Sequence, residues 1–143
     1  MSDRFAWRRA AAPSLDEFAA MAEDAFAALP EEVRRLTGQV VFHVQNFADD
    51  QTLTDLEIED PFELSGLYSG FPVGHQSVLD GVPHTSRVFL YRQPILAEWC
   101  ERGDVPLGEL VAHVLIHEIG HHFGLSDAQI HAIEDAAERE DAR

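Results

Sequence analysis

Apolar side chains recur three or four residues apart near the start of the chain, between Ser14 and Pro30. They are Leu15, Phe18, Ala22, Phe26 and Leu29. This spacing predicts an amphipathic helix, and the capping box of Ser14 with Glu17 marks its start. The helix should end near Pro30, and the "EEVRRL" segment (31–36) should add a short turn of helix before Gly38.

Runs of β-branched and aromatic residues predict the strands. "QVVFHVQNF" (39–47) is typical of a mostly buried strand. The segment "SGLYSGFPVG" (65–74) should form a short strand followed by a turn, and Gly81 and Pro83 predict a further turn. A further strand over 87–92 should stop at Pro94, which cannot donate to a ladder.

The connecting segments predict a loop and two helices. Residues 48–63 are acidic and interrupted by Pro61, as in an exposed loop. "ILAEWCERG" (95–103) predicts a short helix. Asp104 is the expected cap of a long helix, with Pro106 tolerated in its first turn.

Composition narrows the class of protein. The 143 residues suffice for one α+β domain over 1–143, with residues 1–13 flexible. The net charge of −16, from 26 acids and 10 bases, argues against binding nucleic acid or an anionic membrane by charge. Cys100 is the single cysteine, and the first residues contain no apolar run typical of a signal peptide. We therefore expect a cytoplasmic protein.

Four of the eight histidines lie in "HVLIHEIGHHFGLSD" (113–127). On a helical wheel the apolar side chains gather on one side: Ala112, Leu115, Ile116, Ile119 and Phe123. His117 and His121 fall on the opposite side, about 6 Å apart along the axis, so both rings reach one ion at roughly 2.1 Å. Glu118 is rotated by about 100°, which places it beside the ion, where it can hold a water. This is what an H-E-x-x-H metal site requires.

The motif extends beyond its two histidines. A chance H-E-x-x-H in a chain of this composition has a probability of roughly four in a hundred. Adding Gly124 and Asp127 at their fixed offsets lowers the probability to roughly two in ten thousand. The extended pattern is therefore a specific signal.

Five positions match H-E-x-x-H-x-x-G-x-x-[HD], the zinc signature of metzincin-type metallopeptidases: His117, Glu118, His121, Gly124 and Asp127. Over about 66–131, through "GLYSGFP", "SRVFLYRQPIL" and "HEIGHHFGLSDAQIH", the chain resembles a family of small bacterial zincin-like proteins regarded as predicted metallopeptidases. The resemblance implies a compact single-domain zincin-like α+β fold, in which a small mixed sheet packs against an N-terminal helix and the H-E-x-x-H helix. It also implies a metal site of His117, His121 and Asp127.

The identity of the third ligand stays open on the residues alone. Ser126 and Gln129 form a second capping box, which predicts a new helix. Asp127, His131 and Glu134 share one stripe of that helix, and each is able to bind zinc. The spacing of the signature favours Asp127, although an acid in a first helical turn is also stabilised by the helix dipole.

The neighbouring histidines have other expected places. His113 lies one turn before His117, where it lines the cleft or, as we prefer, is partly buried and hydrogen-bonded. His122 should sit on the flank of the helix, beside the ligands or at the surface.

These residues predict a zinc-dependent metallopeptidase acting on a peptide or protein substrate. Three protein ligands would leave the fourth position of Zn²⁺ to water, whose proton Glu118 would take as general base. If the 87–92 strand is an edge strand beside the active helix, an extended peptide can pair with it. Tyr91 on that strand is expected to be a packed aromatic rather than a group of the cleft.

One departure from the metzincins supports an alternative function. Sixteen residues follow Asp127 and the methionines are Met1 and Met21, so we expect no Met-turn. The cleft should be shallow or completed by another chain; the sequence does not indicate an oligomeric state. The alternatives are a metal-binding scaffold or partner-binding module with little peptidase activity, and a hydrolase of non-peptide amides or esters.

Overall fold

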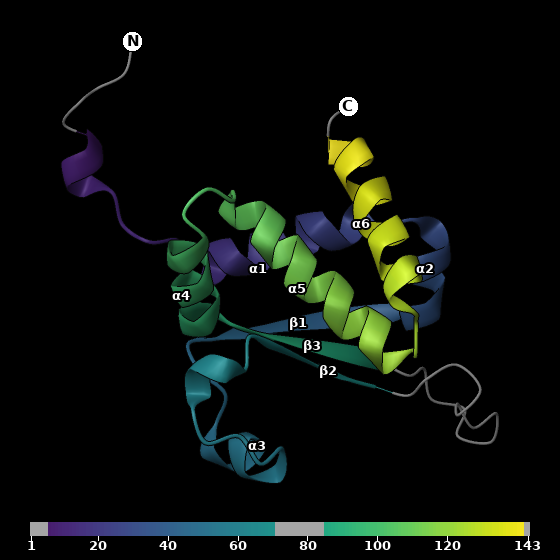
Figure 1. The fold of residues 1–143 in the computed structure, drawn as a ribbon, viewed down its shortest axis with the longest axis horizontal. Coiled ribbons are helices and arrows are strands. Elements are labelled where there is room, and N and C mark those ends of the chain that lie inside the picture. Colours follow the sequence, from purple (N-terminus) through teal and green to yellow (C-terminus); the bar gives the residue numbers. More distant parts are fainter. Residues whose placement is uncertain (1–5, 71–84, 142–143) are drawn as a thin grey trace.

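A mixed sheet with helices on both faces organises the protein (Figure 1). The computed structural model describes residues 6–70 and 85–141. In chain order its elements are η1 (Ala6–Arg9), α1 (Leu15–Ala27), α2 (Glu31–Thr37), β1 (Gln39–Gln45), α3 (Asp50–Asp55), η2 (Pro61–Glu63), β2 (Gly66–Ser69), β3 (Thr85–Tyr91), α4 (Arg92–Arg102), α5 (Leu107–His122) and α6 (Asp127–Asp141). The expected α+β architecture, in which a small mixed sheet packs against an N-terminal helix and the H-E-x-x-H helix, is confirmed. The turns predicted around 81–83 lie outside the described residues.

The first helix is built as its sequence predicts. The Glu17 N–H donates to Ser14 Oγ, and the Ser14 N–H donates to Glu17 Oε1, both at 3.1 Å. This capping box satisfies two backbone donors that a helix start otherwise leaves unpaired. Phe18 and Ala22 are fully buried, so the apolar stripe of α1 faces the core.

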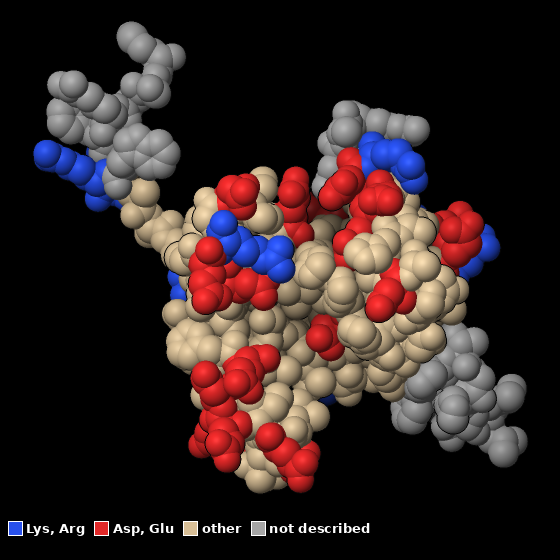
Figure 2. Space-filling view, viewed as in Figure 1, with Lys and Arg blue, Asp and Glu red and all other residues tan. Residues whose placement is uncertain are grey.

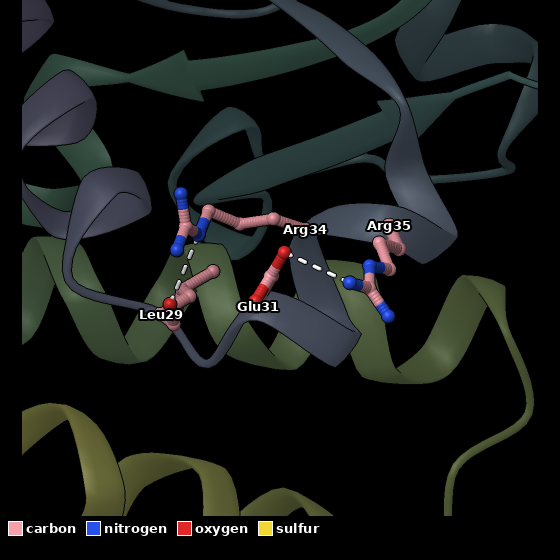
Figure 3. Close-up of polar contacts among 4 residues, drawn as sticks. All are labelled: Leu29, Glu31, Arg34 and Arg35. Atoms are coloured by element: carbon pink, nitrogen blue, oxygen red, sulfur yellow. Dashed lines mark hydrogen bonds and ion pairs between the residues drawn. The ribbon is translucent and has the colours of Figure 1, made fainter.

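The predicted short helix over 31–36 is confirmed as α2. Arg34 Nε donates to the carbonyl oxygen of Leu29 at 3.1 Å, and Arg35 pairs with Glu31 at 2.9 Å (Figure 3). Because Arg35 and Glu31 are both exposed, their ion pair contributes little to stability. The burial of Val33 is what fixes α2 on the core.

The strand order corrects two predictions. Among the described residues the order is β1-β3-β2, with β3 parallel to β1 and antiparallel to β2. The 87–92 segment is therefore the central strand, and pairing of a peptide with its edge is excluded because neighbours occupy both sides. The 39–47 segment, expected to be mostly buried, forms an edge strand in which Val41 is 41% exposed.

The central strand is covered on both faces. Val88 and Leu90 are fully buried under the helices of one face. Tyr91 packs with Ala48 and Leu53 on the other face, where α3 lies (Figure 1). Tyr91 is thus a packed aromatic, as predicted.

The acidic 48–63 segment is not simply an exposed loop. Asp49 Oδ1 accepts a hydrogen bond from the Thr52 N–H at 2.7 Å and caps α3. The buried Leu53 ties this short helix to the sheet. The sequence did not predict this helix, because one cap and one apolar side chain do not form a periodic pattern.

Two proline positions also differ from the predictions. Pro94 lies in the first turn of α4 rather than after the end of β3, a place where its missing N–H costs nothing. Pro106, and not Asp104, is the residue before the first turn of α5. Trp99 Nε1 donates to the carbonyl oxygen of Val105 at 2.6 Å and holds the connection between the two helices.

Helix α5 is the centre of the core, lying between the sheet, α1, α4 and α6 (Figure 1). The predicted apolar face is confirmed at Leu115, Ile116 and Ile119. The buried surface is wider than the wheel predicts, because packing on several sides also covers Leu110, Val111 and Val114. None of the helices in the described ranges is both long and apolar enough to cross a bilayer.

Helix α6 packs closely against α5 after a short turn at Gly124. Gly124 has φ +69°, a left-handed conformation that side chains disfavour. The Leu125 N–H donates to the carbonyl oxygen of Gly120 at 2.8 Å. A Cβ at Gly120 would lie 2.6 Å from Cγ1 of the buried Ile130, so only glycine permits this approach of the helices.

We predict that Gly120→Ala lowers the free energy of unfolding by about 1–3 kcal/mol, because Ile130 is buried and has little room to move. The control is Gly108→Ala on the same helix, where a Cβ meets nothing within 4 Å and stability should rise by about 0.5–1 kcal/mol. Urea denaturation measures both. Equal effects of the two substitutions would contradict the close packing of Gly120 against Ile130.

Candidate metal centre

Three histidines follow one another at four-residue intervals along α5. The rings of His113 and His117 have centroids 4.1 Å apart, and those of His117 and His121 are 5.8 Å apart. His113 and His117 are half-buried, whereas His121 is exposed. Two neighbouring imidazoles in such a row, four residues apart on one helix face, are able to bind the same metal ion.

A carboxylate from α6 meets this row. Glu134 Oε1 lies 3.1 Å from His113 Nδ1 and 2.8 Å from His117 Nε2. Within the described ranges, His113, His117 and Glu134 form a group able to hold a metal ion, with ligand atoms that all lie within 4.8 Å of one another. Two helices therefore bring two imidazoles and a carboxylate together.

Glu134 Oε1 lies at ion-pair distance from both rings. His117 Nε2 and Glu134 Oε1 are buried, and neither has a partner in hydrogen-bond geometry among the described residues. Two ligand atoms on one tetrahedral zinc ion lie roughly 3.4 Å apart, so a small separation of these atoms makes room for an ion. Burial, followed by the nearby His117, lowers the pKa of His113, which favours the neutral imidazole that metals bind. The donor set thus fits a metal ion.

The structure separates the predicted ligands. His117 belongs to the group with Glu134, whereas His121, Asp127 and His131 are exposed and lie outside it. The second capping box is confirmed: the Ser126 N–H donates to Gln129 Oε1 at 2.8 Å, and α6 begins at Asp127. Asp127 therefore has the helix-capping environment that the sequence allowed for it without a metal.

His113 belongs to this group, although the sequence did not predict it as a ligand. We expected a partly buried, hydrogen-bonded histidine, and the structure places it half-buried and 3.1 Å from Glu134. The available signal was its position four residues before His117, which repeats the spacing of His117 and His121. The place of Glu134 opposite these rings depends on the angle between α5 and α6, which the sequence does not state.

Glu118 lies between α5 and the edge strand β2. A Cβ at Gly66 would lie 3.3 Å from Glu118 Cγ and 3.2 Å from the carbonyl oxygen of Phe89. The missing side chain at Gly66 lets the strand approach the helix closely at this point. Burial raises the pKa of Glu118 to about 7, so its carboxyl group is able to hold or release a proton near neutral pH.

His122 is on the flank of the helix, as predicted. Its ring packs against Tyr68, with centroids 4.2 Å apart, and against Phe123. Its Nε2 is buried without a hydrogen-bond partner among the described residues, and burial lowers its pKa. Tyr68 donates to Ser86 Oγ and thereby joins β2 to β3 beneath this ring.

A family model that describes zincin-like metallopeptidases matches residues 37–137. The chain belongs to the zincin-like metallopeptidase family. The match spans the sheet, the H-E-x-x-H helix and most of α6, so all the donors described above lie within it. The family implies a metal ion, typically zinc. A comparison of this zincin-like chain with curated proteins finds no match.

We predict that the metal-free protein loses stability relative to Glu118→Gln as the pH rises from 5 to 8. The folded state holds the Glu118 proton up to about pH 7 and the unfolded state releases it near 4.5, so ionisation in this window opposes folding, on the order of 2 kcal/mol. Thermal unfolding in chelator at both pH values measures the difference. A pH-independent difference would contradict the burial of a protonated carboxyl group.

Proposed function

We propose that this zincin-like protein is a zinc-dependent metallopeptidase. The observation that carries the proposal is Glu118, a half-buried carboxyl group whose pKa burial raises to about 7, directly after His117. A general base works best when its pKa lies near the working pH. Burial of an acid with no basic partner weakens folding, so its presence beside metal-binding side chains supports a chemical role.

The metal would be held by His117 and His121, with Asp127 as the third ligand that the signature indicates. His131 and Glu134 are the other candidates for that third place. Zinc suits two imidazoles and one carboxylate with an open position. When bound, it supplies a Lewis acid that polarises a carbonyl group and acidifies water.

Glu118 would move the proton. As a carboxylate it accepts the proton of the attacking water, and as the acid it returns that proton to the leaving amine. Both forms are populated near pH 7 because burial raises its pKa. The backbone of β2 at Gly66 packs closely against its side chain.

The edge strand and the surface charge bear on the substrate. Among the described residues β2 pairs only with β3, so its other edge is open to strand addition by an extended peptide. Acidic side chains lie over α3 and around α4 and α6 with few arginines among them (Figure 2). This charge favours neutral or basic peptides, and a preference for acidic peptides at low salt would contradict it.

We predict that Glu118→Gln retains zinc and cleaves peptides about 10²–10⁴ times more slowly than wild type. Zinc content and the cleavage of a diverse peptide library measure the two effects. The control is Glu109→Gln, an exposed glutamate on the same helix, which should cleave normally. Wild-type rates in Glu118→Gln would contradict the role of Glu118, and zinc binding by an inactive wild type would favour the scaffold hypothesis.

A comparison of Asp127→Ala, His131→Ala and Glu134→Ala in zinc affinity identifies the third ligand. We expect Asp127→Ala to weaken zinc binding most, by up to about tenfold, because it removes a direct ligand rather than a group that only orients one. Equal binding by Asp127→Ala and wild type would contradict this assignment. The greatest loss in either of the other variants would transfer the role to that residue.

A further inference from the structure

We propose that His113, His117 and Glu134 form a second metal-binding position for a divalent transition-metal ion such as zinc. It shares His117 with the H-E-x-x-H site, so a single chain fills one position or the other. This position goes beyond the proposed function, and it needs no peptidase activity.

The geometry of Glu134 supports this position. One oxygen of its carboxylate is within 3.1 Å of a nitrogen on each of two imidazoles. His117 Nε2 and Glu134 Oε1 lie at ion-pair distance, although they do not meet in hydrogen-bond geometry. A single carboxylate oxygen that faces two imidazole nitrogens is placed to share one ion with both rings. Two imidazoles and a carboxylate are chemically suited to zinc.

The two positions exclude each other because each needs the same atom. His117 Nε2 is the nitrogen that lies against Glu134, and it has one lone pair for a metal. His113 and His121 lie on opposite sides of His117, each about one helical turn away. An ion shared with His113 is therefore displaced along α5 from an ion shared with His121.

The second position lacks a base placed as in the motif. Glu118 directly follows the first histidine of the H-E-x-x-H pair, His117, whereas the residue after His113 is Val114. Val114 is buried and apolar, so it cannot take a proton. An ion between His113 and Glu134 is thus held in a place where the motif provides no catalysis.

A cavity gives ions access to this position. Its volume is about 230 Å³, and both His113 and Glu134 line it. Glu109 and Glu138 also line it, with Arg102 as the basic residue among the lining side chains. Three carboxylates against one guanidinium attract cations.

The test uses the purified, metal-free chain titrated with Co²⁺ and followed by visible absorption, with Zn²⁺ in competition. We expect His121→Ala to keep one binding site with a Kd within about tenfold of wild type, because the second position does not use this exposed side chain. His117→Ala should lose both positions. Adding Glu134→Gln to His121→Ala should weaken binding by at least about 100-fold, whereas adding Glu138→Gln, a carboxylate of the same cavity, should not.

Three results would overturn the second position. The first is binding by His121→Ala as weak as by His117→Ala, while circular dichroism shows both variants folded. The second is no effect of Glu134→Gln in the His121→Ala background. The third is a loss of metal affinity in the single variant Glu134→Gln that is as large as the loss in His121→Ala. That result would mean that Glu134 and His121 bind the same ion in one site.

The outcome is separable from that of the proposed function. If wild type cleaves peptides and His121→Ala binds no metal, the second position is wrong and the peptidase stands. If His121→Ala binds metal through Glu134 and wild type cleaves nothing, the peptidase is wrong and the second position stands.

Discussion

The close packing of α6 on α5 is the contact that brings His113, His117 and Glu134 together. Gly120 has no side chain to collide with Ile130. Gly124 adopts the left-handed conformation of the turn between the two helices. These two conditions bring Glu134 of α6 within 2.8 Å of His117 of α5. A wider crossing would move Glu134 away from the histidines, so the packing of the two helices decides whether this group forms.

The burial of α5 in the core also determines the acid–base behaviour of Glu118. The helix is anchored on several sides by the core, and the same enclosure removes water from Glu118 and raises its pKa to about 7. An exposed glutamate at this position would be ionised throughout the physiological range, and it would be a weaker proton acceptor. The close approach of β2 at Gly66 thus links sheet packing to acid–base chemistry.

Much of this protein could be predicted from local patterns, and the errors have a common cause. Both capping boxes, the amphipathic α1 and the H-E-x-x-H helix depend on residues within a few positions of one another, and local chemistry decides them. The central place of β3 and the contact of Glu134 with His113 depend on how distant segments pair, which one strand or one helix face does not encode. The short α3 was hidden because a single cap and the single buried Leu53 leave no period to detect.

The central claim is that histidines of α5 and a carboxylate hold a metal ion beside Glu118. X-ray absorption at the zinc edge, on protein loaded with one equivalent of zinc, tests it directly. The account predicts two imidazole nitrogens and at least one oxygen at roughly 2.0–2.2 Å, with no sulfur. Fewer than two imidazole nitrogens around the zinc would contradict it. So would a sulfur neighbour, such as the thiol of Cys100, the single cysteine.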